Sequence, residues 1–291
     1  KVVAEFINAE QNEIVFTSGA TDSLNAIAQS FKSSKLINDN PQIILTELEH
    51  HSNIVPWQEF PNKELCYLKI NSNFELEYEE NEIRDINPNI IALTLVSNVT
   101  GTTNNIKKIV KEMRHLFSPN PYIVVDASQA IGHIPIDVKD LDVDFLAFSA
   151  HKMYGPTGIG VLYGKKELFD KLEPFRFGVG IIREVGRERS TWTDIPEKFE
   201  AGTPPIAEAI GLMKAINFIK DIGFKNIVQH EQSLRNYLVQ NLQEIDNIKI
   251  FHPNLSSKAL GVVSFSIEGA HPHDLAEFLG QNNICLRAGH H

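Results

Sequence analysis

The chain has 291 residues, of which 42% are hydrophobic and 22% are charged, so it can bury a sizeable core and is not globally disordered. Its 27 basic and 37 acidic residues give a net charge of −10, which argues against a nucleic-acid-binding surface. No apolar run approaches the ~20 residues of a membrane span, and the first five residues have neither a signal-peptide layout nor a Met. We therefore expect a soluble protein without a membrane role, and the start of the chain suggests a fragment.

Short apolar runs alternate with helix-period segments through the first two thirds of the chain. The runs that we predict as strands are 13–16, 43–46, 66–70, 90–96, 123–125, 145–148 and 159–163. Helices are predicted between several of them, as at 21–31 and at 106–117, where one face carries Ile106, Ile109, Val110, Met113 and Phe117. This alternation is typical of an α/β fold, with a mostly parallel seven-stranded sheet flanked by helices.

After Thr203 the pattern changes to two long amphipathic helices. Thr203 is predicted as the N-cap of the first helix, and the second spans about 225–244. Strands are predicted at 248–251, 260–267 and 284–287, with a helix near 274–281. We therefore expect a large domain at 1–203, followed at 204–291 by an interdomain helix and a truncated α+β C-terminal small domain.

The two cysteines, Cys66 and Cys285, lie in apolar strand-like runs and offer neither a disulfide framework nor zinc spacing. We expect buried, inert thiols and a reducing, cytoplasmic setting. The run from His271 to Asp274 is predicted to be a helix start, so no metal site is predicted.

Asp126 ends one apolar run that is predicted as a strand, and Lys152 follows shortly after another. Burial of a lysine disfavours its ammonium form and lowers its pKa, which suits an amine that attacks a carbonyl group. Pyridoxal 5'-phosphate (PLP) chemistry requires such a lysine, together with a carboxylate that keeps the pyridine nitrogen protonated. Alone, the lysine would more often be a surface residue and the aspartate a turn residue. Parallel strands, however, bring their carboxyl ends to the same edge of a sheet, where ligands bind.

A third feature is the turn at 18–22, between a predicted strand and the helix that begins near Thr21. Free backbone N–H groups and the helix dipole favour an anion there, and the phosphate of a cofactor is a natural ligand. The alternative is a simple N-cap turn.

These motifs identify a resemblance to the cysteine desulfurases of the Suf/Nif type, which are class V aminotransferases and PLP enzymes. The matching segments, in family order, are 49–57, 97–99, 125–126, 149–160, 199–204 and 287–291. The resemblance implies the PLP-dependent transferase fold type I, with a usual N-terminal segment missing. It also implies that L-cysteine is converted to L-alanine, and that the sulfur passes as an enzyme persulfide to an acceptor protein, as in iron–sulfur cluster assembly.

Other reactions of the same cofactor stay open at this point. They are those of a selenocysteine lyase, a cysteine-sulfinate desulfinase or another class V transaminase, and the non-enzymatic alternative is a PLP-free scaffold. Lys152, Asp126, His50 and Gln129 are all present, which speaks against the scaffold.

The resemblance also assigns roles to individual residues. Lys152 and His50 are the expected catalytic residues, and His50 is expected to stack on the cofactor ring. The expected cofactor-binding residues are Ala20, Thr21, His50, Asp126, Gln129, Ser149, His151, Lys152 and Thr203. Asn98 and Arg287 are expected to bind the substrate carboxylate. Because Thr203 matches a segment that reaches the phosphate of a partner subunit, the resemblance implies a homodimer.

The sequence departs from the family pattern at three places. Residues 177–182 stand where Suf-type members commonly have a glycine-rich run, and Pro205 stands where asparagine is frequent. In the family a cysteine nucleophile comes directly after the Gly-His-His motif, whereas this sequence stops at His291. The resemblance therefore implies that the 291 residues alone bind PLP weakly and cannot form the persulfide.

Overall fold

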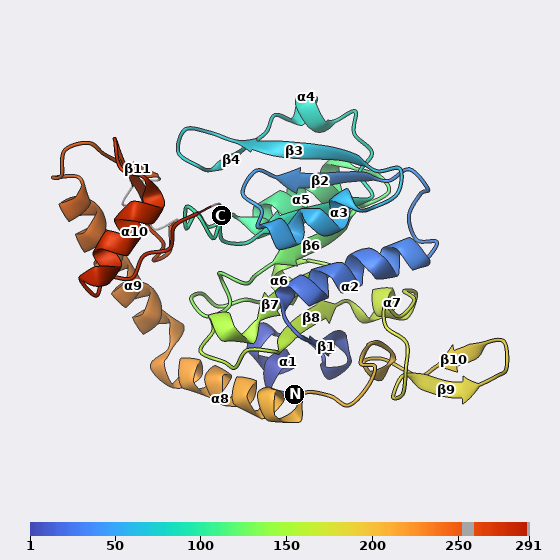
Figure 1. Ribbon diagram of the computed structural model, residues 1–291. Coiled ribbons are helices and arrows are strands. Elements are labelled where there is room, and N and C mark those ends of the chain that lie inside the picture. Colours follow the sequence, from blue (N-terminus) through green and yellow to red (C-terminus); the bar gives the residue numbers. More distant parts are fainter. Residues whose placement is uncertain (252–258, 290–291) are drawn as a thin grey trace.

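The computed structural model describes residues 1–251 and 259–289, and in these residues eight strands form one sheet with helices on both faces (Figure 1). The sheet order is β1-β8-β7-β6-β5-β2-β3-β4. The strands are β1 (Ile14–Thr17), β2 (Gln42–Thr46), β3 (Glu64–Ile70), β4 (Leu76–Glu77), β5 (Ile90–Thr94), β6 (Tyr122–Asp126), β7 (Phe145–Ser149) and β8 (Gly160–Gly164). The five strands from β7 to β3 run parallel, whereas β8 is antiparallel to both of its neighbours and β4 is antiparallel to β3.

The predicted α/β fold with a mostly parallel sheet is confirmed. All seven predicted strands belong to this sheet, with boundaries that shift by a residue or two. The additional strand, β4, has two residues and pairs with the end of β3 at the edge of the sheet. A two-residue strand is too short to produce a hydrophobic pattern.

Helices cover both faces of the sheet because alternate residues of the central strands point to opposite sides. In β5, Ile91 and Leu93 belong to the core beneath α5, whereas Ile90 and Ala92 belong to the core beneath α2. The helices that precede the C-terminal part are α1 (Val2–Ile7), α2 (Ala20–Ser33), α3 (Val55–Gln58), α4 (Glu80–Ile83), α5 (Ile106–Leu116), α6 (Val138–Leu141) and α7 (Lys166–Phe169). Short 3-10 turns are η1 (Gln11–Glu13), η2 (His51–Asn53), η3 (Ala150–Lys152) and η4 (Glu197–Phe199).

The apolar face predicted for α5 is buried. Its buried residues are Ile106, Ile109, Val110 and Met113, and Phe117 is buried directly after the helix. Asn105 caps the first turn, because its Oδ1 accepts a hydrogen bond from the Lys108 N–H at 3.1 Å. Each buried side chain of this size contributes about 1.5–3 kcal/mol, so packing of this face holds α5 on the sheet.

The C-terminal part contains α8 (Ile206–Ile222), α9 (Phe224–Leu242) and α10 (Pro272–Gln281). The prediction that Thr203 caps α8 is wrong, because the N-cap residue is Pro205. A residue that precedes a proline is disfavoured in the helical region. Since Pro204 precedes Pro205, the helix starts only after both prolines.

In the same part, β11 (Ile248–Phe251) pairs antiparallel with β12 (Ser264–Ile267), which is shorter than the predicted strand at 260–267. The strand predicted at 284–287 is wrong, since these residues have no regular structure and Ile284 is exposed. A strand needs a neighbour with which to pair. For the same reason Cys285 is exposed rather than buried, whereas Cys66 is half-buried in β3.

A hairpin of β9 (Ile182–Val185) and β10 (Ser190–Trp192) projects from the body of the molecule (Figure 1). Large apolar side chains are exposed on it and on the segment that leads to it, namely Phe177, Val179 and Val185. None of the helices in the described part of the chain has the length and hydropathy of a transmembrane segment.

Substitution of Gly160 tests the contact between β8 and the turn before α2. A Cβ at this position would meet the Cα of Gly19 and would lie 2.8 Å from the Phe148 carbonyl oxygen. We expect Gly160→Ala to lower the free energy of unfolding by about 1–3 kcal/mol, measured by urea denaturation. Gly178→Ala is the control, because a Cβ there meets nothing within 4 Å. Equal stability of the two variants would contradict the steric argument.

Candidate active site

Lys152 and Asp126 lie at the carboxyl edge of the sheet. Asp126 is the last residue of β6 and is 5% exposed, and Lys152 ends the turn η3 that directly follows β7. Burial lowers the pKa of Lys152, the charge of Asp126 opposes this shift, and the charge of Arg287 adds to it. The amine and the carboxylate therefore interact, and burial biases Lys152 toward its neutral form.

The backbone after β6 fixes the carboxylate of Asp126. Its Oδ1 accepts a hydrogen bond from the Ser128 N–H at 2.9 Å. The next residue, Gln129, is half-buried and lines a cavity of about 300 Å³ together with His133 and Glu231. His133 Nδ1 lies 2.5 Å from Glu231 Oε1, so the segment after β6 contacts α9 at this cavity. The structure thus places Gln129 one turn beyond the carboxylate.

His50 belongs to the same group of side chains. It is the N-cap residue of η2, and its Nδ1 accepts a hydrogen bond from the Ser52 N–H at 3.1 Å. Burial lowers the pKa of His50, the charge of Lys152 lowers it further, and the charge of Asp126 opposes both effects. Burial therefore favours the neutral imidazole, and in that form the ring proton lies on Nε2, because Nδ1 is an acceptor.

The turn at the start of α2 adjoins the end of β7. The Ala20 N–H donates to Ser149 Oγ at 2.7 Å, and the Thr21 hydroxyl lies 2.7 Å from the Ser52 hydroxyl. Three segments therefore meet at the first turn of this 14-residue helix, where N–H groups and the helix dipole favour an anion. His151 is exposed in η3, next to Lys152.

The residues expected to bind a substrate carboxylate lie on two loops. Asn98 is half-buried in the turn after Ser97, whose Oγ accepts a hydrogen bond from the Thr100 N–H at 3.2 Å. Arg287 is exposed, but its charge lowers the pKa of both His50 and Lys152. The C-terminal segment therefore brings a guanidinium group to the same site. His290 and His291 lie outside the described residues.

Thr203 is not brought into this group. It is exposed in the loop before α8, and among the described residues no hydrogen bond links it to Lys152 or Asp126. The loop itself is anchored elsewhere, since Glu200 Oε1 accepts a hydrogen bond from the Phe16 N–H at 2.7 Å.

Glu49 is a buried acid that the sequence did not single out. Its Oε1 accepts hydrogen bonds from the Thr46 hydroxyl and the Thr94 N–H, both at 2.7 Å, and its Oε2 accepts one from Asn53 Nδ2 at 2.6 Å. Burial raises the pKa of Glu49 to about 8, although its three hydrogen bonds oppose this shift, and the charge of Asp126 adds to it. The signal that could have revealed it is an acid directly before His50, in a segment flanked by apolar residues.

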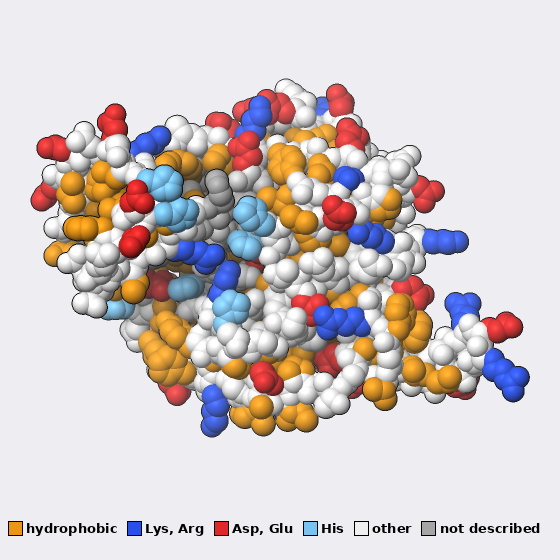
Figure 2. Space-filling view, in the orientation of Figure 1, with side chains coloured by type: hydrophobic (Ala, Val, Ile, Leu, Met, Phe, Trp, Pro, Cys, Tyr) orange, Lys and Arg blue, Asp and Glu red, His pale blue; other side chains and the backbone are white. Residues whose placement is uncertain are grey.

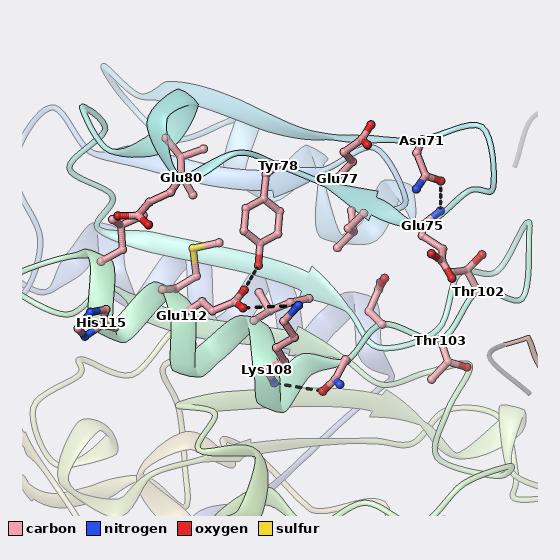
Figure 3. A pocket seen from close by; sticks show the side chains of 17 residues that line it. Asn71, Glu75, Glu77, Tyr78, Glu80, Thr102, Thr103, Lys108, Glu112 and His115 are labelled. Atoms are coloured by element: carbon pink, nitrogen blue, oxygen red, sulfur yellow. Dashed lines mark hydrogen bonds and ion pairs between the residues drawn. The ribbon is translucent and has the colours of Figure 1, made fainter.

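Histidine and basic side chains gather in the middle of one face, between the sheet and the lobe that contains α9 and α10 (Figure 2). A separate cavity of about 690 Å³ lies between β4 and α5, where Tyr78 donates a hydrogen bond to Glu112 at 2.6 Å (Figure 3). None of the predicted site residues lines it. In the described ranges, no three His, Cys, Asp or Glu side chains gather to hold a metal ion.

Replacement of Asp126 tests its electrostatic contact with Lys152. Asp126→Asn keeps the acceptor for Ser128 but removes the negative charge, so the pKa of Lys152 should fall further. The measurement is the pH dependence of acetylation of Lys152, followed by mass spectrometry. Lys165 is the internal reference: burial lowers its pKa, but Asp142 and Asp144 outweigh that effect and raise it. An unchanged Lys152 profile would show that the two groups do not interact.

Comparisons with known proteins agree with this geometry. The family model described as Aminotransferase class-V matches residues 1–291. A cysteine desulfurase of Haloferax volcanii is 40% identical, and the match covers 99% of this chain and 68% of the relative. The apo structure of a cysteine desulfurase from Thermococcus onnurineus NA1 is 38% identical with a TM-score of 0.93, and the match covers 100% of this chain and 72% of that one.

A more distant solved structure shares the fold. It is a variant of C-DES with glycine covalently linked to the PLP cofactor, 21% identical, with a TM-score of 0.85. The match covers 99% of this chain and 76% of that one. Sequence, fold and site geometry together show that the chain belongs to the class V aminotransferase family and, within it, to the cysteine desulfurases.

Proposed function

We propose that this chain carries the catalytic site of a PLP-dependent cysteine desulfurase, which converts L-cysteine to L-alanine and passes the sulfur on as an enzyme persulfide. The observation that carries the proposal is the interaction of the half-buried Lys152 amine with the buried Asp126 carboxylate, next to the start of α2. The names of the similar proteins support the same activity.

The side chains at the site fit PLP in their chemistry. Asp126 is the partner for the ring nitrogen, Gln129 for the ring hydroxyl, and His50 for the ring face. The donors for the phosphate group are those at the start of α2 and the end of β7, namely Ala20, Thr21, Ser149 and His151. When bound, PLP supplies an electron-accepting ring that takes up the electron pair of the substrate Cα–H bond.

The residues of the chain divide the proton transfers between them. Lys152 is the residue that would hold the cofactor and that, as a neutral amine, would take the Cα proton of the substrate. Burial of Lys152 serves this step, because it lowers the pKa of the amine. Asp126 keeps the proton on the ring nitrogen. His50 exchanges protons at Nε2, because its Nδ1 accepts the Ser52 N–H.

Substrate recognition and sulfur transfer involve the C-terminal segment. Arg287 and Asn98 bind the carboxylate of L-cysteine, a group that suits a guanidinium fork and an amide. In the resembled family a cysteine nucleophile follows the Gly-His-His motif, and we infer that such a thiolate attacks the substrate sulfur. The new S–S bond forms as the Cβ–S bond breaks, and the electron pair left on carbon takes up a proton to give alanine.

The assembly and cellular setting belong to the same proposal. Exposed Thr203 and the projecting hairpin with its apolar side chains support a homodimer, in which Thr203 reaches the phosphate of the partner subunit. We place the large domain at 1–203 and the small-domain part at 204–291, and we assign the protein to the cytoplasm, where it supplies an acceptor protein for iron–sulfur cluster assembly.

Replacement of Lys152 tests its role as the anchor of the cofactor. Lys152→Ala should abolish the visible absorption band of lysine-bound PLP and the lysine–PLP adduct that borohydride traps. Lys166→Ala is the control, because Lys166 is exposed and pairs with Asp170 at 3.4 Å. A trapped adduct in the Lys152→Ala variant would assign the anchor to another residue.

Turnover assays test the reaction itself. The 291-residue chain, loaded with PLP, should release no alanine in repeated turnover, whereas a chain extended by a cysteine after His291 should release alanine and sulfide from L-cysteine with a thiol present. Repeated turnover by the 291 residues would contradict the assigned nucleophile. Preference of the extended chain for L-selenocysteine or L-cysteine sulfinate would favour the corresponding lyase or desulfinase instead.

A further inference from the structure

Glu49 joins three segments around His50. Its carboxylate accepts hydrogen bonds from Thr46 at the end of β2, from Thr94 at the end of β5 and from Asn53 in η2. The side chain is 8% exposed, so these protein groups take the place of water around the carboxylate. One side chain thus ties the turn that carries His50 to two strands of the sheet.

The neighbours of Glu49 are themselves fixed as donors. Trp57 Nε1 donates to Asn53 Oδ1 at 3.2 Å, which turns the amide NH₂ group of Asn53 toward Glu49. The Leu48 N–H donates to Thr46 Oγ1 at 3.1 Å, which leaves the hydroxyl hydrogen of Thr46 for Glu49. Position 49 therefore requires an acceptor on both of its terminal atoms, and glutamine supplies only one.

The same network fixes the backbone and the ring of His50. The Asn53 N–H donates to the His50 carbonyl oxygen at 2.7 Å, while the Asn53 side chain is held by Glu49. The Ser52 N–H donates to His50 Nδ1. Rotation of the His50 backbone would therefore break its bond to Asn53 and pull Asn53 away from Glu49.

Glu49 is also linked, through Thr94, to the strand that carries Asp126. Thr94, whose N–H donates to Glu49, pairs with Asp126 between β5 and β6. We propose that Glu49 is a positioning residue, which holds the imidazole of His50 where it faces the cofactor ring. This inference rests on the proposed function, because the position of the cofactor ring is inferred from Lys152 and Asp126.

An NMR titration of His50 in the cofactor-free protein tests the inference without turnover. Glu49→Gln sets an NH₂ group against that of Asn53, so the turn should loosen and expose the His50 ring. The pKa of His50, which burial lowers, should then rise toward its ordinary value of about 6.5. Glu49 is not among the groups whose charge shifts the pKa of His50, so a rise of this pKa reports exposure of the ring. The charged or titratable groups whose fields reach His50 are kept in the variant, namely Lys152, Asp126, His51 and Arg287.

Exchange of the Cα proton of L-alanine with D₂O in the PLP-loaded protein gives a second measurement. Glu49→Gln should slow this exchange roughly 10- to 100-fold. In a His50→Ala background the same change should have little further effect, because Glu49 acts through His50. An equally large loss in both backgrounds would mean that Glu49 only stabilises the fold, and would overturn the proposal.

Glu47→Gln is the matched control. Glu47 is exposed in the same loop, and its Oε2 accepts a hydrogen bond from the Ile70 N–H. This variant should keep the wild-type titration and exchange rate. If Glu49→Gln does not fold, Thr46→Val removes one donor to Glu49 and should also raise the pKa of His50.

The outcomes separate this proposal from the proposed function. A His50 titration that stays at or below the wild-type pKa in the folded variants refutes the role of Glu49. Failure of the wild-type protein to bind PLP contradicts the proposed function instead, and the titration of His50 still decides the role of Glu49.

Discussion

The parallel alignment of β5, β6 and β7 is the constraint on which the site depends. Their carboxyl ends meet at one edge, where Thr94 pairs with Asp126, and Asp126 pairs with Ala147, two residues before the end of β7. The turn after β7 adds Lys152 to this edge. Hydrogen bonds between strands set the register, and a shift of register would separate the acid from the amine. The meeting of Lys152 and Asp126 at one edge is thus a consequence of strand order.

Much of the fold could be predicted because buried parallel strands carry continuous apolar runs. The same holds for α5, where the spacing of apolar residues matches the face that packs on the sheet. The start of α8 could not be predicted from cap chemistry alone, because two consecutive prolines overrule the preference of Thr203 for an N-cap. Residues 284–287 have the composition of a strand but no partner strand in the described residues, and composition does not reveal a missing partner.

The site was predictable to the extent that its chemistry leaves a trace in sequence. A lysine and an aspartate at strand ends are such a trace, and the structure brings Lys152, Asp126, His50 and Arg287 within electrostatic reach of one another. The catalytic and binding roles of these residues stay predictions, as do those of Asn98, Gln129 and Thr203. Glu49 was missed because an acid in a turn normally faces water. Only the fold shows that strand ends surround it with donors, one of them a backbone N–H group that no sequence pattern can indicate.

The hydrogen bond from the Ala20 N–H group to Ser149 Oγ bears on how the proposed cofactor would bind. The first N–H group of α2 already has a hydroxyl partner from the neighbouring strand, so the helix end keeps its shape with no outside anion present. Under the proposed function, a phosphate group would meet a helix end whose first N–H group is already held in place. Binding of the phosphate group to such a preorganised helix end would cost little conformational entropy of the chain.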